Sequence, residues 1–146
     1  MKDARQTAFN ILLKLHRNNA YSNIALNSAL AENNLSQTES SLTTALVYGV
    51  TERLITLDYN LSLYLSQPIK KLRPEVLIAL RLGAYQLLFL DRIPPSAAIN
   101  ESVNLAKSNK CGFASGLINA VLHKVNANGL SLPEKVNNSL KYYSVK

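Results

Sequence analysis

The sequence contains few of the residues on which disulfides and metal sites depend. Its only cysteine is Cys111, which excludes an internal disulfide and a cysteine-based zinc site. A chain without disulfides is typical of a reducing compartment, so we expect a cytoplasmic protein. The two histidines, His16 and His123, lie far apart, and neither has a second metal ligand at a suitable spacing. We therefore expect no metal site and a structural or solvent-facing role for both histidines.

Long hydrophobic runs are also missing. The longest apolar stretch, residues 76–90, is interrupted by Arg81 and Gln86 and falls short of the roughly 20 apolar residues that a bilayer span needs. The first four residues, MKDA, are not followed by a signal-peptide core with a small-residue cleavage site. We therefore expect a soluble protein with no contact to a membrane.

Groups arranged for catalysis or cofactor binding are missing as well. The five glycines do not form the glycine-rich turn after a strand that holds a dinucleotide or a phosphate. No pair among the nine acidic residues stands out as a general acid and base. The lysine beside Cys111 could make its thiol nucleophilic, but we favour a small residue in a loop. We expect neither a catalytic residue nor a cofactor site in this chain.

What the chain does contain is a helical hydrophobic pattern. Of its 146 residues, 47% are hydrophobic and 17% are charged, a composition typical of one globular domain with a single core. Apolar residues recur at spacings of three and four, and the sequence has no strand-like alternation of any length. The pattern predicts an all-α protein, a compact bundle of seven or eight helices.

Capping residues and helix breakers indicate where the first helices begin and end. Asn18-Asn19 ends the first helix, and Ser22 can cap a second one that runs to about Asn33. Residues 36–39, SQTE, form a capping box at the start of a long helix. Residues 57–65 are either the continuation of that helix or a short separate one.

The later helices are marked by prolines and by a final glycine. Pro74 suits the first turn of a helix, and residues 76–90 are apolar nearly all round, which is typical of a central, buried helix. Ser96 can cap the helix that follows Pro94-Pro95. Residues 117–125 make the last strong helix, which Asn128-Gly129 ends.

Four residues inside the helical segments are unusual for their positions. Gly49 and Gly83 would let a neighbouring helix approach closely. Asn100 and Asn119 each lie within an apolar helical segment, where an unpaired amide is costly. We expect each amide to bond to a neighbouring backbone, with a role at a partner surface as the alternative.

The positive charge of the chain is concentrated at its two ends. The net charge is +7; residues 1–20 and 107–146 are basic, whereas the middle is close to neutral. If the ends converge in space, they form a positive face of the kind that binds RNA. The alternative is that scattered lysines only keep the protein soluble. Tyr48 and Tyr85 could stack on unpaired bases, although at helical spacing they are more often core. The candidate RNA-binding residues are Lys2, Arg5, Lys14, Arg17, Lys107, Lys110 and Lys124.

Three segments together resemble one known family. They are residues 80–88, LRLGAYQLL, residues 93–103, IPPSAAINESV, and residues 116–122, GLINAVL. With YGV at 48–50 and the helix pattern from the N-terminus, they look like the NusB-type RNA-binding domain over about residues 4–126. Each segment is weak alone, and the combination is specific.

Two branches of this family share the domain. One is the transcription antitermination factor NusB, which binds boxA RNA. The other is the N-terminal domain of the RsmB family, also called Sun or Fmu, which methylates C5 of a cytosine in 16S rRNA. Gly83, Tyr85-Gln86 and Asn119-Ala120 are similar to the methyltransferase branch, and so is the basic character of His123-Lys124. That branch usually has arginine where His123 stands, so a specific RNA contact there does not carry over.

The resemblance implies a role for this chain and a partner domain beyond it. Residues 1–128 would be a NusB-like RNA-binding domain that binds 16S rRNA, and residues 129–146 a short helix and the start of a linker. The linker would lead, in cis, to a catalytic domain that binds S-adenosylmethionine and is absent from these residues. The alternatives are a free-standing antitermination factor and a helical protein-interaction module. The sequence leaves the oligomeric state open.

Overall fold

A computed structural model describes residues 4–32 and 37–132 of the protein. These residues form seven α-helices and two short 3-10 helices, with no β-strand among them, so the predicted all-α bundle is confirmed. The elements are α1 (Ala4–Asn18), α2 (Asn23–Ala31), α3 (Gln37–Glu52), α4 (Leu54–Ser62), η1 (Ile69–Lys71), α5 (Pro74–Phe89), α6 (Pro95–Ser108), η2 (Gly112–Ala114) and α7 (Ser115–Asn128).

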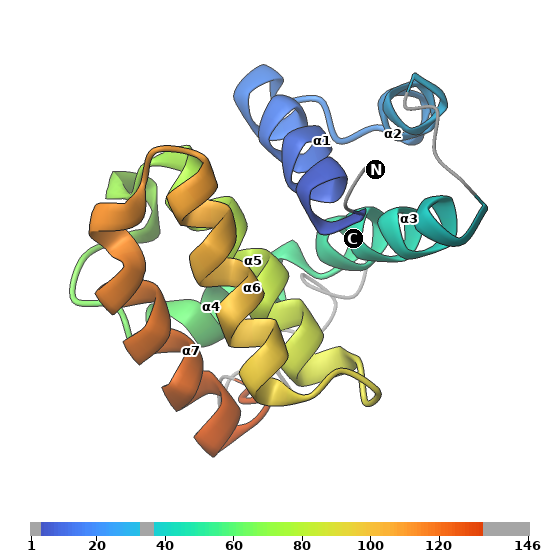
Figure 1. The fold of residues 1–146 in the computed structure, drawn as a ribbon. Helices are drawn as coiled ribbons and strands as arrows, with labels where there is room; N and C mark the ends of the chain where they lie inside the picture. The colour runs from blue at the N-terminus through green and yellow to red at the C-terminus, as the bar shows by residue number, and fades with distance from the viewer. Residues whose placement is uncertain (1–3, 33–36, 133–146) are drawn as a thin grey trace.

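Helix α5 is the centre of the molecule. It begins at Pro74, whose missing N–H costs nothing in the first turn, and its residues 76–86 are all buried. It packs against α1, α3, α4, α6 and α7. Figure 1 shows α1, α2 and α3 on one side of the molecule and α4, α6 and α7 with α5 on the other. The prediction of a central buried helix is therefore confirmed.

Two glycines allow the helices around α5 to approach closely, as predicted. A Cβ at Gly49 of α3 would collide with the ring of Tyr85. A Cβ at Gly83 of α5 would collide with Ser102 Oγ of α6 and Leu122 Cδ1 of α7. A side chain at either glycine would therefore prevent α3, α6 or α7 from packing as closely against α5 as it does.

Of the two serines predicted to cap a helix start within the described residues, one does so and the other does not. The Ser22 side chain caps α2 by accepting a hydrogen bond from the Ala25 N–H. Ser96 does not cap α6, because Pro95 already occupies the first helical turn and Pro94 is the N-cap. Proline has a fixed φ that suits this first turn, so the helix starts before Ser96. The proposed capping box begins at Ser36, which lies outside the described residues.

The helix ends agree more closely with the sequence pattern. Helix α1 ends at Asn18, and Asn19 follows in the left-handed conformation with a φ of 51°. Helix α2 ends at Ala31, slightly before the predicted Asn33, which lies outside the described residues. Helix α4 is a separate helix, because Arg53 leaves helical geometry between α3 and α4. Helix α7 ends at Asn128, and Gly129 has a φ of 70°, as the Asn-Gly pair predicts.

The chain after α7 is attached to α4 by a buried amide. Asn60 is fully buried; its Nδ2 donates to the Ser131 carbonyl oxygen at 3.1 Å, and its Oδ1 accepts from the Ser131 N–H at 2.8 Å. Residues 129–132 are therefore fixed to the bundle rather than separate from it. Most of the segment predicted as a short helix and linker, residues 133–146, lies outside the described residues.

Candidate nucleic-acid interface

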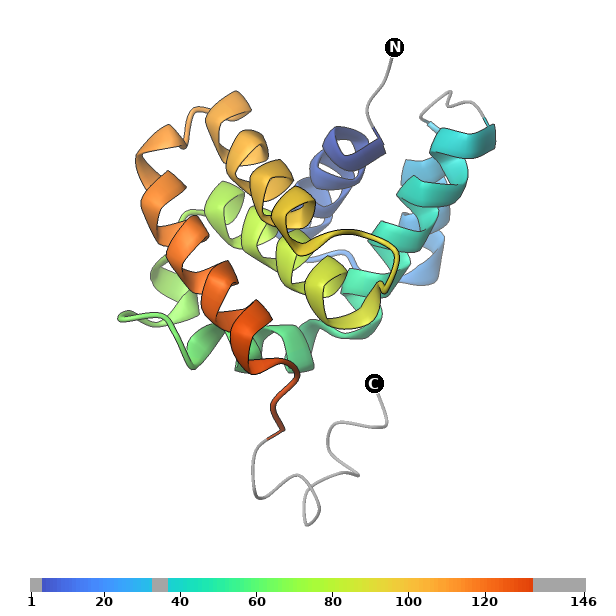
Figure 2. The same cartoon turned by 60° about the horizontal axis from the view of Figure 1, so that its bottom comes forward.

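One end of the bundle brings together helix ends that are far apart in sequence. The end of α1, the start of α5, the end of α6 and the start of α7 meet there, and Figures 1 and 2 show the last three side by side. Glu75, in the first turn of α5, links two of these elements. Its carboxylate lies 2.8 Å from Arg17 Nη2 of α1 and 3.7 Å from Arg73 Nε.

The end of α6 adds two lysines to this region. Lys107 lies in its last turn, and Lys110 follows with a left-handed φ of 66°. The Cys111 N–H then donates to the Ala106 carbonyl oxygen at 2.7 Å, which closes the helix end and leaves both lysine side chains exposed. Burial, with a further contribution from the negative charge of Glu75, raises the pKa of the Cys111 thiol. Cys111 is therefore a buried packing residue and not an activated nucleophile.

A hollow of about 300 Å³ opens beside these cations. Lys71, Arg73 and Phe113 line it together with apolar residues of α5 and α7. Phe113 lies in η2 and is 72% exposed. An exposed aromatic ring among cations can stack on an unpaired base while the cations contact phosphates. We call Arg17, Lys71, Arg73, Lys107, Lys110 and Phe113 the basic end.

Sequence reasoning identified only half of the basic end. Arg17, Lys107 and Lys110 were predicted, whereas Lys71, Arg73 and Phe113 were not. The two missed cations lie in a middle segment whose charge is close to neutral overall, so the net charge of that segment gives no sign of them. The run KKLRPE at 70–75 was the available signal, because it places three cations just before a predicted helix start.

Three other predicted RNA contacts, Arg5, Lys14 and Lys124, do not join this cluster. Arg5 lies about 18 Å along α1 from Arg17, and its Nε donates to Gln86 Oε1 at 3.0 Å. Lys14 is exposed and forms an ion pair with Glu32 at 3.7 Å. Lys124 is exposed on the later half of α7, away from the start of that helix. Lys2 lies outside the described residues. Among the described candidates, only Arg17, Lys107 and Lys110 therefore lie in the basic end.

The structure corrects the interpretation of two asparagines. Asn100 of α6 and Asn119 of α7 are both exposed, so their amides are not buried and bonded to neighbouring backbone as we expected. Their helices bury the apolar side and turn these positions to the surface. Of the two tyrosines, Tyr85 is a core residue as favoured by its spacing, and Tyr48 is half-buried.

The two histidines have ordinary structural surroundings. His123 is exposed on α7, and His16 Nδ1 lies 3.3 Å from the Tyr21 hydroxyl. Within residues 4–32 and 37–132, no group of three or more His, Cys, Asp or Glu side chains is placed to hold a metal ion. In the same part of the chain, no helix has the length and apolar character required to cross a bilayer.

The fold and the sequence together define the class of protein. Residues 2–127 match the NusB family, and the chain belongs to that family. The solved structure of Thermotoga maritima NusB superimposes with a TM-score of 0.79 at 20% identity, covering 88% of this chain and 91% of that one. A solved complex of the antitermination factors NusB and NusE with double-stranded RNA gives a TM-score of 0.75 at 25% identity, covering 86% and 94%.

Within the family, the chain is similar to two kinds of protein. It is 39% identical over 86% of its length to a probable ribosomal RNA small subunit methyltransferase B of Bacillus subtilis, of which it covers 28%. It is 30% identical over 87% of its length to the transcription antitermination protein NusB of Ruminiclostridium cellulolyticum, of which it covers 88%. The chain thus spans less than a third of the methyltransferase relative and most of the antitermination relative.

Proposed function

We propose that this chain is the RNA-binding domain of a cytoplasmic 16S rRNA (cytosine-C5)-methyltransferase that uses S-adenosylmethionine. In this proposal the domain binds and orients rRNA, and a catalytic domain downstream in the same protein carries out the methyl transfer. The observation that carries the proposal is the higher identity to methyltransferase B relatives, 39–40% over about 85% of the chain, than to the antitermination relative matched over the same length.

The basic end supplies the physical support for RNA binding. It gathers five cations from α1, η1, the start of α5 and the end of α6. The carboxylate that lies among them, Glu75, is paired with Arg17 and Arg73. Each cation that contacts a phosphate releases condensed counterions, which stabilises the complex at low salt. Phe113 adds a surface on which an unpaired base can stack.

The second candidate function is that of a free-standing antitermination factor that binds boxA RNA. It is favoured by the match to the antitermination protein of Ruminiclostridium cellulolyticum, which covers nearly all of both chains. A helical protein-interaction module remains the third alternative, and no particular contact of the described residues favours it. The genomic sequence after the codon for Lys146 separates the first two directly.

A salt titration tests the proposal in solution. The purified protein is titrated with a 16S rRNA fragment and, in parallel, with a boxA RNA, at several salt concentrations. We expect tighter binding of the rRNA fragment and an affinity that falls steeply as salt rises. Preference for boxA would instead support the antitermination function. Failure to bind either RNA would contradict both RNA-binding functions and leave the protein-interaction module.

A further inference from the structure

An acidic residue, Glu75, lies among the cations of the basic end, where its carboxylate weakens the positive potential that attracts RNA. Only 13% of its side chain is exposed, whereas 52% of the Arg17 side chain and 60% of the Arg73 side chain are exposed. The acid is thus the inner member of the group, and the two arginines are its outer members. What Glu75 contributes to this surface must therefore come from its contacts with them.

Glu75 is held in place by the backbone of the central helix. It lies in the first turn of α5, where the positive end of the helix dipole favours a negative charge. A carboxylate that is nearly buried is costly unless cations lie beside it. The side chains of Arg17 and Arg73 are long and have many rotamers, so they can move to the carboxylate more easily than it can move to them. Glu75 is therefore the fixed point to which the two arginines are drawn.

Each oxygen of the Glu75 carboxylate faces a different arginine. Oε2 accepts a hydrogen bond from Arg17 Nη2 at 2.8 Å, and Oε1 lies 3.7 Å from Arg73 Nε. Oε1 is buried and has no hydrogen-bond partner among the described residues, so a closer approach of Arg73 would be favourable. Two guanidinium groups that would otherwise repel each other, one from α1 and one from the residue before α5, are thereby held beside one carboxylate.

The arginines keep donors for an RNA phosphate. A guanidinium has five N–H donors, and Arg17 donates one of them to Glu75 Oε2. The exposed remainder of the fork suits a phosphate, which guanidinium groups bind through two parallel hydrogen bonds. A side chain that is already restrained loses less freedom when it binds. Arg17 and Arg73 held by Glu75 are therefore expected to bind phosphates more tightly than the same arginines without it.

We infer that Glu75 is a positioning residue of the RNA-binding surface, which holds Arg17 and Arg73 in the orientation that contacts RNA phosphates. This role rests on the proposed RNA-binding function and adds to it a residue that itself carries the wrong charge for RNA. The negative charge of Glu75 opposes binding, and its hold on the arginines favours binding. At this site the hold on the arginines is the larger effect, so removal of the carboxylate weakens binding.

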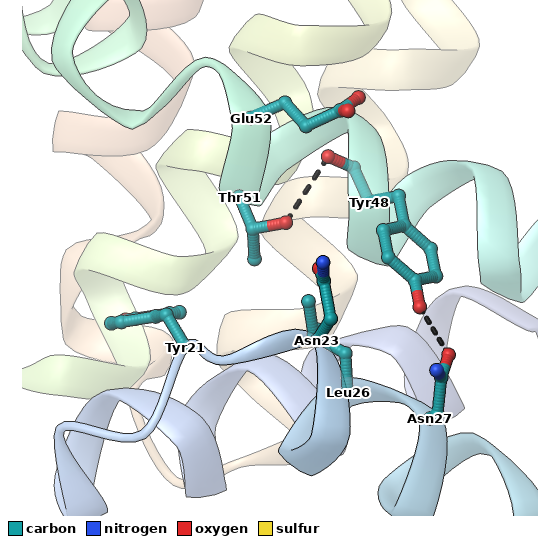
Figure 3. A pocket seen from close by; sticks show the side chains of 7 residues that line it. All are labelled: Tyr21, Asn23, Leu26, Asn27, Tyr48, Thr51 and Glu52. Carbon is teal, nitrogen blue, oxygen red and sulfur yellow. Dashed lines mark hydrogen bonds between the residues drawn. The ribbon is translucent and has the colours of Figure 1, made fainter. Parts of the chain in front are cut away.

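A second paired acid provides the matched control. Figure 3 shows Glu52 among the residues that line a hollow between α2 and α3, outside the basic end. Glu52 lies 3.9 Å from Arg53 Nη1, but 68% of its side chain is exposed, so it is solvated as well as paired. No basic side chain is found among the described residues that line this hollow. Loss of the Glu52 carboxylate therefore changes the net charge by the same amount without releasing a cation of the basic end.

Charge-neutralising variants test the inference through the sign of their effect. Glu75→Met and Glu52→Met each remove one negative charge, and both are titrated with a 16S rRNA fragment at several salt concentrations. We expect Glu75→Met to bind about tenfold more weakly, because two arginine side chains then have to be ordered on binding. Glu52→Met should bind as tightly as the wild type or more tightly. The slope of log affinity against log salt should become shallower for Glu75→Met only.

Two further substitutions at the same position separate charge from shape. Glu75→Gln makes the same charge change but keeps the shape of the side chain and one oxygen acceptor. It should weaken binding in the same direction even if Glu75→Met folds poorly. Glu75→Asp keeps the charge at the start of α5 and should restore most of the affinity, because the flexible arginines can follow the shorter carboxylate.

Removal of the arginines should reverse the effect. In a protein that carries Arg17→Gln and Arg73→Gln, we expect Glu75→Met to strengthen binding, because only the repulsion between its carboxylate and RNA remains to be lost. A substitution that weakened binding merely by disturbing α5 would do so in both backgrounds. Urea denaturation verifies that each variant is folded under the conditions of the titration.

The outcomes separate this role from the proposed function. If Glu75→Met and Glu75→Gln bind the rRNA fragment as tightly as the wild type, or more tightly, the positioning role is rejected and the RNA-binding function stands. Equal weakening by Glu75→Met with and without the two arginines rejects the positioning role as well. Absence of RNA binding by the wild type rejects both the RNA-binding function and the positioning role.

Discussion

Arg81 carries its guanidinium into the interior of the bundle. Only 7% of the side chain is exposed, and its Nε and Nη2 each donate to a different Asp58 oxygen at 2.8 Å. Burial by itself lowers the pKa of Arg81, but the hydrogen bonds and charge of Asp58 outweigh it and raise the pKa above its ordinary value. Among the described residues, Nη1 has no hydrogen-bond partner. The ion pair therefore joins α4 to α5, and Asp58 is the residue that compensates the buried positive charge of Arg81.

The two partners of this ion pair should respond unequally to mutation. Asp58→Ala leaves a buried, uncompensated guanidinium, and we expect it to lower the free energy of unfolding by about 3–5 kcal/mol. Arg81→Met leaves a carboxylate whose side chain is 29% exposed and can be hydrated, so the loss should be smaller. Urea denaturation of both variants measures the difference. A larger loss for Arg81→Met would contradict the unequal dependence.

His16 should make the stability of the fold depend on pH. Burial, reinforced by the positive charge of Arg81, lowers the pKa of His16 below its ordinary value of 6.5. The unfolded chain then binds a proton at a higher pH than the folded chain does. The contribution of His16 to the free energy of unfolding is therefore fully present above about pH 6.5. It decreases as the pH falls below 6.5 toward the lower pKa of the folded state.

The contribution of His16 can be isolated by substitution. His16→Gln should remove this part of the decrease, which thermal unfolding between about pH 7 and pH 5 would reveal. His123→Gln is the matched control, since that imidazole is exposed on α7. Identical pH profiles for the wild type and His16→Gln would show that His16 has no such role.

At the scale of single elements, the ends of α1 and α6 differ in how well their residues tolerate the left-handed backbone conformation. Asn19 and Lys110 are both left-handed and both close a helix, but asparagine tolerates this conformation better than lysine. Helix α6 therefore ends on a strained residue that also belongs to the basic end. The sequence pattern favoured a loop at Cys111 without indicating that Lys110 before it is left-handed.

Lys110→Gly should separate stability from RNA affinity. Glycine adopts the left-handed conformation without a steric penalty, so we expect the free energy of unfolding to rise by about 1 kcal/mol. Loss of the exposed ammonium should at the same time weaken salt-sensitive RNA binding. Asn19→Gly is the control, with a smaller gain expected in the same urea denaturation assay. A decrease in the stability of Lys110→Gly would show that its side chain stabilises the helix end by other contacts.

At the scale of the whole molecule, the exposed cations are concentrated in the basic end. The salt dependence of RNA binding can show whether this concentration matters. We expect Lys71→Gln with Lys107→Gln, both in the basic end, to reduce the slope of log affinity against log salt by about 0.7–0.9 for each phosphate that is no longer neutralised. Lys14→Gln with Lys124→Gln removes the same charge from positions outside that cluster and should change the slope less. Filter binding to a 16S rRNA fragment over a range of salt concentrations compares the two pairs. Equal slopes would mean that the basic end is no more important than the dispersed lysines.

Much of the architecture follows from local sequence. The spacing of apolar residues predicted an all-helical bundle, the buried α5 and the close approaches at Gly49 and Gly83, because helical periodicity places residues three and four apart on one face. Ser22 and Asn128-Gly129 marked helix boundaries for the same local reason. The resemblance to the NusB family was carried by short segments of these same helices.

Tertiary structure alone decided which residues share a surface. Lys71 and Arg73 look ordinary in a neutral segment, and they join Arg17, Lys107 and Lys110 only because α1, α5 and α6 pack with those ends together. Asn100 and Asn119 proved exposed because the faces that α6 and α7 bury were set by their neighbours. Local sequence does not show which side chains of other helices lie beside a given charge or amide. The distance between them depends on how the helices pack and not on their separation along the chain.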